Sequence, residues 1–362
     1  MLGMKLFGDI YKGKRVLITG HTGFKGSWLA LWLHEMGAVV IGVALEPETK
    51  PNHWDILQLP AEDHRFDIRD NNAVNNVITK YKPEIVFHLA AQSLVRRSYM
   101  NPVETWDTNI MGTVNILEAC RYHPCVRAII VVTSDKCYEN NEWPWGYREN
   151  DRLGGFDPYS ASKAGTEIVC ASYKNSYFNS NRIALLATAR AGNVIGGGDW
   201  SEDRLIPDII RSIKFKQSLE IRSPSSTRPW QHVLDCLSGY LLLGHKLLLG
   251  ERKYAEAWNF GPSVESNRTV AQIIEVFKLK LNTLAWHITE KKQLHETSLL
   301  YLDSTKARNE LNWSPVLNID KTLTATIDWY SALLDDQEVI SRLQLKNYIA
   351  EAVRQKKSWV LP

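Results

Sequence analysis

The segment "VLITGHTGFKGSW" (residues 16–28) constrains the fold of this chain more than any other segment. An apolar run typical of a buried strand leads into Gly20, Gly23 and Gly26, and a helical pattern follows directly. In this context the glycines permit, in order, a tight turn, a close approach of the backbone to a ligand, and close packing of the helix. Because the free amides at the start of such a helix bind a pyrophosphate, the segment predicts a dinucleotide site. A glycine-rich turn without a ligand is the alternative interpretation.

Charged residues in and after this segment bear on the identity of the dinucleotide. Lys25 would stand in the first helical turn, where a cation is unfavourable against the helix dipole unless an anion binds there. His21 is placed to reach the same anion. The acid expected after the second strand comes late, at Glu46, and no arginine follows it to hold a 2′-phosphate, which favours NAD over NADP. Asp67 in "DIRD" is placed to bind the adenine amino group, although a turn aspartate has the same pattern.

Strand-like and helix-like segments alternate over the first half of the chain. The strand-like segments are 15–19, 39–45, 84–91, 127–134 and 183–190, and the helix-like segments are 26–37, 72–83, 101–124 and 160–178. This alternation predicts βαβ units and a Rossmann-type, doubly wound α/β fold, with a parallel sheet covered on both faces. The alternation ends in the glycine-rich, polar segment "AGNVIGGGDWSEDRLIPD" (191–208), which we interpret as a long functional loop.

The remainder of the chain mixes helices with short strands and predicts a smaller C-terminal α+β lobe that binds the substrate. We expect residues 1–192 plus about 226–262 to form the NAD-binding domain. Residues from about 193 to 225 plus 263–362 would form the substrate-binding lobe. A ligand would then lie between the two, over the carboxyl ends of the strands.

Composition and charge exclude several classes of protein. The chain has 362 residues, a net charge of +3 and no basic run of five residues, so nothing indicates binding to nucleic acid. Five cysteines form no CxxC pair and show no metal-ligand spacing with histidine, so we expect reduced thiols, no metal and a cytoplasmic protein. The longest apolar run, residues 240–250, is too short to cross a bilayer, and the N-terminus lacks a signal-peptide pattern.

A tyrosine and a lysine four residues apart, Tyr159 and Lys163, share one face of a predicted helix. A tyrosine is a poor base near neutral pH, because its ordinary pKa is about 10. A nearby lysine cation stabilises the phenolate and lowers that pKa, and the same lysine can hold a nicotinamide ribose. Ser134 or Thr133 supplies a hydroxyl from a strand end. A chance Y-x-x-x-K in an amphipathic helix is the alternative.

The segment "TSDK" (133–136) places an acid and a base side by side at the end of a predicted strand. Asp135 and Lys136 either form an ion pair that closes the strand or act as acid and base in the chemistry. In the second case Asp135 must be protonated and Lys136 neutral, which requires burial or neighbouring positive charge. A proton shared by the pair is a third possibility. The residues alone leave these alternatives open.

Motifs over nearly the whole chain resemble the extended short-chain dehydrogenases/reductases that act on nucleotide sugars. They are the glycine segment, "HLAA" (88–91), the Ser134–Tyr159–Lys163 set, "TWDTNIMGTVNILEA" (105–119), "NVIGGGDW" (193–200), "RLIP" (204–207), "RPWQHVLD" (228–235) and "WNFGP" (258–262). Within that family, "GHTGFKGSW", "TSDKCYEN" and "STRPWQHVLD" together resemble the CDP-glucose 4,6-dehydratase branch. Two positions depart from the family's pattern. Relatives acting on dTDP-glucose carry Asp-Glu at 135–136, and typical members carry an acid where the second strand here counts to Ala44.

The resemblance implies a lyase that uses NAD to convert CDP-glucose to CDP-4-dehydro-6-deoxyglucose and water. Tyr159 would take the C4 hydroxyl proton, Asp135 would be the acid at O6 and Lys136 the base at C5, with Ser134 and Lys163 in support. Residues expected at NAD are Gly20, His21, Gly23, Phe24, Lys25, Gly26, Asp67, Ile68, Leu89, Ala90, Ala91, Asn109, Tyr159 and Lys163. Residues expected at the nucleotide sugar are Ser93, Asn193, Arg204, Leu205, Arg228, Asn259 and Tyr301, with Arg190 as a further phosphate candidate.

Other functions share parts of this pattern. A nucleotide-sugar 4-epimerase uses the glycine segment and the Tyr–Lys pair without a C5 base, and a GDP-mannose or dTDP-glucose 4,6-dehydratase differs in the nucleotide. A regulator that binds NAD without catalysis belongs to another class, but it has little use for Ser134, Tyr159 and Lys163 together. The resemblance also implies a homodimer that pairs helices 101–123 and 159–178, or a homotetramer, and a role in making dideoxy sugars of bacterial O-antigen lipopolysaccharide.

Overall fold

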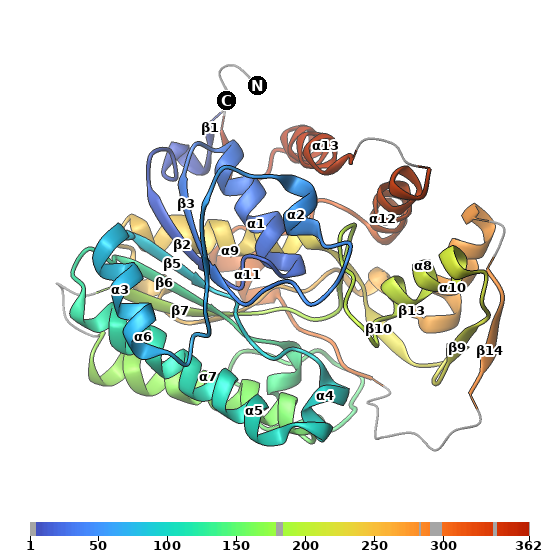
Figure 1. Cartoon of the computed structure of the whole chain (residues 1–362), viewed down its shortest axis with the longest axis horizontal. Helices are drawn as coiled ribbons and strands as arrows, with labels where there is room; N and C mark the ends of the chain where they lie inside the picture. The colour runs from blue at the N-terminus through green and yellow to red at the C-terminus, as the bar shows by residue number, and fades with distance from the viewer. Residues whose placement is uncertain (1–4, 179–183, 282–283, 290–298, 336–338, 362) are drawn as a thin grey trace.

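A seven-stranded parallel sheet forms the centre of the molecule (Figure 1). The structure is a computed structural model and describes residues 5–178, 184–281, 284–289, 299–335 and 339–361. The strands run in the order β12-β7-β6-β5-β2-β3-β4. Their bounds are β2 Arg15–Thr19, β3 Val39–Ala44, β4 Glu62–Arg65, β5 Ile85–His88, β6 Ala128–Val132, β7 Leu185–Arg190 and β12 Ala257–Asn259. The order reverses between β2 and β5, and an open α/β sheet binds ligands outside the strand ends at such a point.

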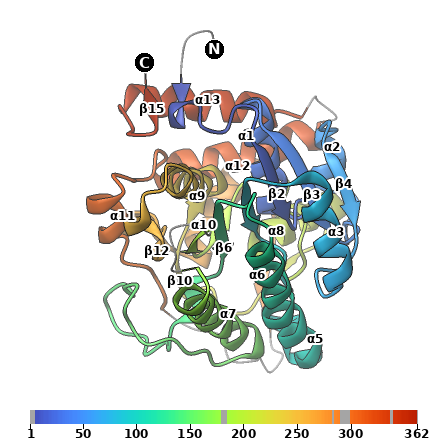
Figure 2. The same cartoon turned by 90° about the vertical axis from the view of Figure 1, so that its left-hand side faces the viewer.

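Helices cover both faces of the sheet (Figure 2). On one face lie α1 Phe24–Glu35 and α9 Val233–Leu248, and on the other lie α3 Asn71–Tyr81, α6 Gly112–Tyr122 and α7 Pro158–Ser176. Alternate residues of one strand enter the two cores, because Val16 and Ile18 pack with the first group and Leu17 with the second. Burial on both faces explains why the strands are continuous apolar runs. The predicted doubly wound α/β fold is confirmed.

The helix predicted over 101–124 is continuous but not uniform. α5 Pro102–Trp106 leads into a π-helical turn, η2 Asp107–Met111, and α6 follows without a break. Its Asn109 side chain is buried and donates to Ser162 Oγ of α7 at 2.8 Å. Such turns are rare, and the spacing of apolar residues does not reveal them.

Short strands and two helices form the smaller end of the molecule, to the right in Figure 1. β10 Thr227–Pro229 pairs with β13 Asn267–Thr269, and β9 Leu219–Ile221 pairs with β14 Trp286–Ile288. α8 Leu205–Phe215 and α10 Val270–Leu281 lie beside these strands. The predicted α+β character is confirmed, whereas the division of the chain into two domains stays a prediction.

The prediction of one long loop over 191–208 is wrong in two places. β8 Val194–Ile195 pairs with β11 Gln231–His232, and α8 begins at Leu205. Ile206, Ile209 and Ile210 share the buried face of this helix. Pro207 is tolerated because the amides of the first helical turn have no partner within the helix.

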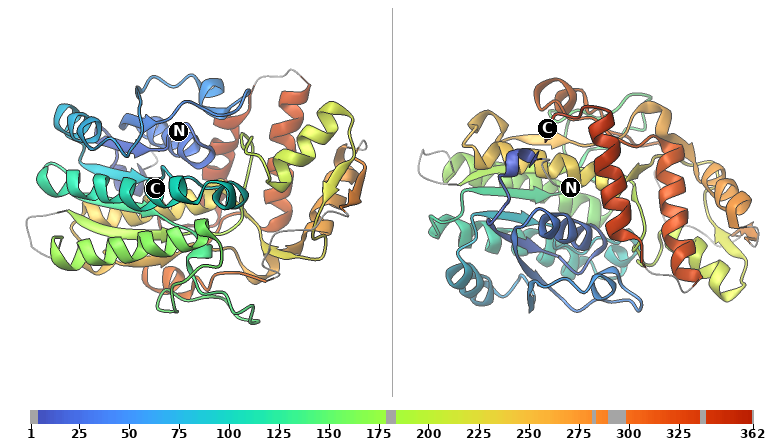
Figure 3. Two further views of the ribbon diagram at one scale, coloured as in Figure 1. Left: turned by 60° about the horizontal axis from the view of Figure 1, so that its bottom comes forward. Right: turned by 90° about the horizontal axis from the view of Figure 1, so that it is seen from above.

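The C-terminal helices α12 Ile319–Leu334 and α13 Ser341–Arg354 lie side by side (Figure 3). The chain ends in β15 Val360–Leu361, which pairs with β1 Lys5–Leu6. Trp359 stacks on Phe7 with ring centroids 5.1 Å apart, so the two ends of the chain pack together. The remaining elements are η1 Phe7–Asp9, α2 His53–Leu57, α4 Val95–Met100, η3 Asp135–Cys137, η4 Arg252–Tyr254, η5 Val264–Ser266 and α11 Thr305–Glu310.

None of the helices in the described ranges has the length and apolar character needed to cross a membrane. Within the same ranges no group of His, Cys, Asp and Glu side chains is arranged to hold a metal ion. The five cysteines are free thiols.

Candidate active site

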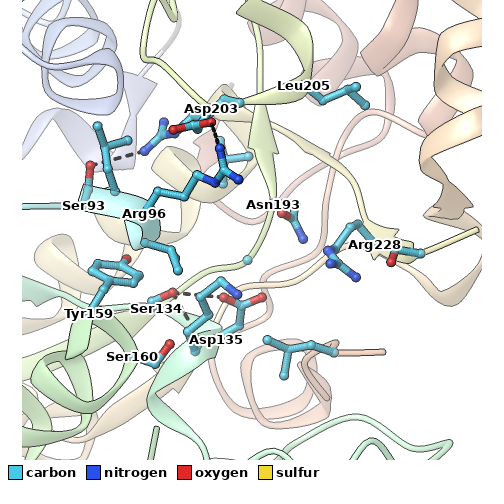
Figure 4. Close-up of a pocket in the computed structure, with 18 of the residues that line it drawn as sticks. Ser93, Arg96, Ser134, Asp135, Tyr159, Ser160, Asn193, Asp203, Leu205 and Arg228 are labelled. Carbon is cyan, nitrogen blue, oxygen red and sulfur yellow. Dashed lines mark hydrogen bonds and ion pairs between the residues drawn. The ribbon is translucent and has the colours of Figure 1, made fainter. Parts of the chain in front are cut away.

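A cavity of about 720 Å³ lies at the carboxyl ends of β6 and β7. Its walls come from the loops after these strands, from α8, and from β9 and β10 of the smaller end. Figure 4 shows Ser134, Asp135 and Tyr159 together on one side of the cavity, with Asn193 and Arg228 across from them. The cavity therefore joins four of the predicted catalytic residues, Ser134, Asp135, Lys136 and Tyr159, to several of the predicted substrate residues.

The glycine segment forms the predicted cradle next to this cavity. Gly20 follows β2 with φ +77°, and a Cβ there would lie 2.8 Å from the backbone nitrogen of Ala90. A Cβ on Gly26 would lie 2.1 Å from the carbonyl oxygen of Gly20, so the helix packs as closely as the spacing predicts. Gly23 is the N-cap of α1 and provides no side-chain cap. The first amides of α1 thus remain available to a pyrophosphate, and the segment fits a dinucleotide.

His21 and Lys25 take other places than predicted. The His21 ring is fully buried against Gly42, and its Nε2 lies 2.8 Å from Asp63 Oδ1. Burial lowers the pKa of His21, although Asp63 opposes this. Lys25 extends toward α9, with Nζ 3.5 Å from the hydroxyl of Tyr240, and lines the active-site cavity. His21 is thus engaged by Asp63 and Lys25 by Tyr240, and their contact with a phosphate stays a prediction.

The other predicted cofactor residues divide into two groups. Leu89, Ala90 and Ala91 follow β5 directly, beside the glycine turn, where Ala90 N donates to Thr19 Oγ1 at 3.2 Å. Phe24 lines the cavity. The second group is engaged elsewhere.

In that second group, Asp67 forms an ion pair with Arg69 at 2.6 Å, and Ile68 is buried against Gly112. Asn109 Oδ1 accepts from the amide of Gln92 at 2.8 Å. Asp67 and Asn109 are thus already occupied by protein partners. β3 ends at Ala44, the position at which typical family members are expected to carry an acid. Glu46, beyond the strand, is exposed.

Tyr159 and Lys163 lie one turn apart on α7 and are both buried. Lys163 Nζ donates to the carbonyl of Val132 at 3.2 Å. Burial, together with the charge of Lys25, lowers the pKa of Lys163 to about 8. Burial raises the pKa of Tyr159 to about 12, with the Ser134 hydroxyl acting in the opposite direction. The predicted lowering of the Tyr159 pKa is therefore wrong for this structure, because desolvation of the phenolate outweighs its polar neighbours.

Asp135 and Lys136 open the short helix η3 at the end of β6. Ser134 Oγ donates to Asp135 Oδ1 at 3.0 Å and accepts from the backbone amide of Lys136 at 3.2 Å. Asp135 is only 4% exposed, and burial raises its pKa against the charges of Lys136, Lys25 and Arg228. No ion pair within 4 Å joins Asp135 to Lys136 in the described part of the chain. The arrangement favours a protonated acid at residue 135 over a closed ion pair.

Several predicted substrate residues line the cavity, namely Ser93, Asn193, Arg204, Leu205 and Arg228. Arg204 is held by Asp199 at 3.1 Å and donates to Ser93 Oγ at 3.3 Å. These residues come from segments far apart in the sequence, and the fold brings them to one cavity.

Three further residues predicted at the substrate, Asn259, Tyr301 and Arg190, lie outside the cavity wall. Asn259 is fully buried, and its Oδ1 accepts from the Tyr138 hydroxyl at 2.8 Å. The Tyr301 hydroxyl donates to the carbonyl of Pro144. Arg190 is 3% exposed and forms an ion pair with Glu167 at 2.9 Å. The side chain of each is already engaged by another part of the protein.

Sequence reasoning missed a cluster of three charged residues at the cavity. Asp203 Oδ1 accepts from Arg96 Nη1 and from Arg222 Nη2, each at 3.2 Å. Arg96 belongs to α4, and Arg222 follows β9, so the cluster joins the main body to the smaller end (Figure 4). The only available signals were the closeness of Arg96 to Ser93 and of Asp203 to Arg204 in the sequence.

Comparisons with known proteins place this site in a family. The family model described as GDP-mannose 4,6 dehydratase matches residues 17–326. A curated relative from Salmonella typhimurium, CDP-glucose 4,6-dehydratase, is 46% identical and covers 96% of this chain and 99% of its own length. A probable dTDP-glucose 4,6-dehydratase from Sinorhizobium fredii is 27% identical over 87% of this chain and 92% of its own.

Solved structures share the fold. An epimerase from Methanothermobacter thermautotrophicus has a TM-score of 0.80 and 25% identity, over 90% of this chain and 95% of its own. The dTDP-glucose 4,6-dehydratase DesIV from Streptomyces venezuelae has a TM-score of 0.76 and 22% identity, over 90% of this chain and 99% of its own. Both an epimerase and a dehydratase thus share the fold, so the fold alone does not choose the chemistry. The family model spans well over half of the chain, and this protein belongs to the GDP-mannose 4,6-dehydratase family of nucleotide-sugar enzymes.

Proposed function

We propose that this protein is an NAD-dependent lyase, a CDP-glucose 4,6-dehydratase, that forms CDP-4-dehydro-6-deoxyglucose and water. The observation that carries the proposal is the buried carboxyl of Asp135, held by Ser134 in the same cavity as Tyr159. An oxidoreductase or epimerase needs the tyrosine, but only a dehydratase needs a separate acid to expel a hydroxyl group. The curated CDP-glucose 4,6-dehydratase that is 46% identical supports the same substrate and reaction.

The dinucleotide fits the cradle formed by Gly20, Gly23 and Gly26. Backbone atoms lie close to the position that a Cβ would take at each of these glycines. Leu89, Ala90 and Ala91 would flank it, and Tyr159 and Lys163 would meet its nicotinamide end. When bound, NAD takes the C4 hydride of the sugar and later returns a hydride at C6. We expect binding of the dinucleotide at α1 to depend mainly on backbone amides, since Asp67 is already paired with Arg69.

The protein's own residues move the protons. Tyr159 removes the proton of the C4 hydroxyl during oxidation, and the resulting ketone makes the C5 proton acidic. A base removes that proton, and Asp135 gives its proton to O6, so that the C6–O6 bond breaks and water leaves. The proton removed at C5 is replaced in the last step. Burial favours the protonated form of Asp135 that this role requires.

Lys136 is our candidate for the C5 base. It lines the cavity next to Asp135, and the Ser134 hydroxyl fixes its backbone amide. The relatives with Asp-Glu at these positions place a carboxylate there, so this chain would use an amine for the same proton. A Lys136→Met variant that kept full dehydration would contradict this assignment.

The nucleotide diphosphate would face the cationic wall of the cavity. Arg228 and Arg204 are placed for the phosphates, and Asn193 and Ser93 for phosphate or sugar oxygens. Cytosine as the base is supported by the CDP-glucose relative, not by a contact of this cavity. GDP-mannose and dTDP-glucose are therefore the substrates to be compared.

A homodimer fits an apolar surface away from the cavity. A shallow pocket of about 390 Å³ is lined by Trp106, Asp107, Ile110, Met111, Gly165, Ile168 and Val169 of the α5–α6 helix and α7. Trp106, Met111 and Ile168 are 42%, 48% and 59% exposed, which is unusual for such side chains unless a partner covers them. Two copies would bury these helices about a two-fold axis, and a tetramer would join two such dimers. The product would feed the synthesis of dideoxy sugars for O-antigen lipopolysaccharide in the cytoplasm.

One reaction in heavy water tests the proposal. Purified protein, NAD and CDP-glucose are incubated, and the product is analysed by mass spectrometry. We expect loss of one water with one deuterium retained at C5. Unchanged mass, or a C4 epimer without loss of water, would contradict it. Parallel reactions with dTDP-, UDP- and GDP-sugars measure the nucleotide preference.

A further inference from the structure

Gly192 stands where the backbone after β7 passes the carboxyl of Asp135. A Cβ at residue 192 would lie 2.6 Å from Asp135 Oδ2 and 3.3 Å from its Cγ. The φ angle of Gly192 is outside the left-handed region, so other residues can adopt its backbone conformation. The need for glycine here is therefore steric and concerns one carboxyl oxygen.

The main chain and a proline complete the seat of this carboxyl. The Asp135 amide donates to the carbonyl of Ala191 at 3.4 Å, which joins the ends of β6 and β7 at this point. The same Cβ position is 3.6 Å from Pro229 Cγ, so the gap beside the carboxyl at residue 192 is also bounded by a ring of β10. Ser134 holds the other carboxyl oxygen, Oδ1, at 3.0 Å. A hydrogen bond thus fixes Oδ1, and the absence of a side chain at residue 192 leaves the space for Oδ2.

We infer that Gly192 is a positioning residue for the elimination step, which rests on the proposed dehydratase function. It leaves the space in which Asp135 aims its proton at the departing hydroxyl of the sugar. The step is balanced within the site. The C5 proton goes to the proposed base Lys136, the electrons of the C5–H bond form the C5–C6 double bond, the C6–O6 bond breaks, and the Asp135 proton goes to O6, which leaves as water.

An alanine at residue 192 would push the carboxyl away from its seat. Tyr159 and Lys163 lie on α7, and neither supplies any of the three heavy atoms nearest to the new Cβ, which belong to Asp135 and Pro229. Oxidation at C4 and removal of the C5 proton should therefore continue, while loss of water slows. The structure predicts an imbalance between these steps, not a uniform loss of activity.

The test compares wild type and Gly192→Ala with CDP-glucose and NAD in heavy water. We expect water loss to slow by roughly 100-fold, within the range that a general acid contributes. The CDP-glucose recovered from the variant should carry deuterium at C5, because deprotonation there is no longer followed by elimination. Equal slowing of exchange and of water loss would overturn the inference. An unimpaired variant would do the same.

A substrate with a better leaving group separates positioning from general damage. Fluoride leaves C6 with little need of a proton, so with CDP-6-deoxy-6-fluoroglucose the loss caused by Gly192→Ala should shrink to within about fivefold. Asp135→Asn provides the matched variant, since Gly192→Ala added to it should slow water loss no further. A loss for the fluoro substrate as large as that for CDP-glucose would overturn the inference.

If Gly192→Ala folds poorly, Asp135→Glu probes the same seat, because its carboxyl is one methylene too long for the gap. Unreacted CDP-glucose recovered from Asp135→Glu should also carry deuterium at C5. Recovery of unlabelled CDP-glucose from this variant would count against the inference. Wild type that releases no water from CDP-glucose would instead overturn the proposed function itself. The two failures are thus distinguished by the wild-type reaction in the same series.

Discussion

Asp135 and Glu167 are two carboxyl groups with the same exposure, 4%, and quite different surroundings. Glu167 on α7 accepts from Arg190 Nε and Nη2 at 2.9 Å each and from the Thr188 hydroxyl at 2.7 Å. Among the residues that the structure describes, Asp135 accepts one side-chain hydrogen bond, from Ser134 at 3.0 Å. The two carboxyls are therefore equally buried, but hydrogen bonds and an ion pair stabilise a charge on Glu167 more fully than a charge on Asp135.

The two pKa shifts have opposite signs for this reason. Burial raises the pKa of Asp135, and the opposing charges of Lys136, Lys25 and Arg228 do not cancel it. Burial also acts to raise the pKa of Glu167, but the charge and hydrogen bonds of Arg190 lower it overall. A buried carboxyl with complete partners is part of the framework, and one with incomplete partners is available for proton transfer.

The largest expected effect is on the reaction, from Asp135→Asn. We expect dehydration of CDP-glucose to slow by about 10² to 10⁴, because the amide has no acidic proton to give to O6. The free energy of unfolding should not fall, since the replaced carboxyl is the poorly compensated one. Measurement of water loss and of a denaturant unfolding curve checks both parts. An unfolded variant, or one with full activity, would break the distinction between the two carboxyls.

Replacing Arg190 should act mainly on stability, whereas replacing Asp135 acts mainly on the reaction. Arg190→Met leaves the buried Glu167 without its cation and should lower the free energy of unfolding by about 3 to 5 kcal/mol. The matched control is Arg190→Met combined with Glu167→Leu, which removes both charges and should recover most of that loss. Unfolding in urea measures each step. A single variant as stable as wild type would show that Glu167 does not depend on Arg190.

The pH dependence of stability should also differ in sign. The folded-state pKa of Asp135 is raised, so its contribution to stability is present below the unfolded pKa of about 3.9 and is lost as pH rises through the folded value. The folded-state pKa of Glu167 is lowered, so its contribution is present above about 4.3 and is lost as pH falls through the folded value. Asp135→Asn should therefore gain stability relative to wild type with rising pH, and Glu167→Gln should lose stability. Unfolding curves from about pH 2 to about pH 8 test this, because they cover the range below the unfolded pKa of Glu167. Parallel pH profiles for the two variants would contradict it.

Sequence reasoning found one of these carboxyls and misread the partner of the other. Asp135 follows an apolar strand in a motif, so its place at the strand end was predictable. Arg190 also ends an apolar strand and was predicted to face a phosphate, but its guanidinium turns into the core to meet Glu167. The partner lies 23 residues earlier on a helix, and a salt bridge across such a distance leaves no local pattern.

The parallel sheet and the glycine cradle were predictable because each depends on neighbours in the sequence. The apolar period gives the strands, and the spacing of Gly20, Gly23 and Gly26 gives the turn. Contacts between distant segments were not predictable, as with His21 and Asp63 at 2.8 Å. The seat of Asp135 is of the same kind, because Gly192 has meaning only once β6 and β7 lie side by side.

The smallest effect is expected from a third carboxyl, that of Asp203, which extends the comparison to a partly exposed acid. Its side chain is 39% exposed between Arg96 and Arg222, so Asp203→Asn should change the free energy of unfolding by less than about 1 kcal/mol. Removing a negative charge from a cavity that binds a diphosphate should lower the KM for the nucleotide sugar by about twofold to fivefold at low ionic strength. Added salt should erase the difference, because it screens exposed charges.

Asp328→Asn is the control for this charge change, since Asp328 is exposed on α12 and does not line the cavity. Its KM should match that of wild type at every salt concentration. A rise in KM for Asp203→Asn that persists in high salt would mean that the acid orients Arg96 and Arg222 rather than opposing the substrate's charge. In that case even a partly exposed carboxyl would belong to the framework, and the number and geometry of its partners would matter more than its burial.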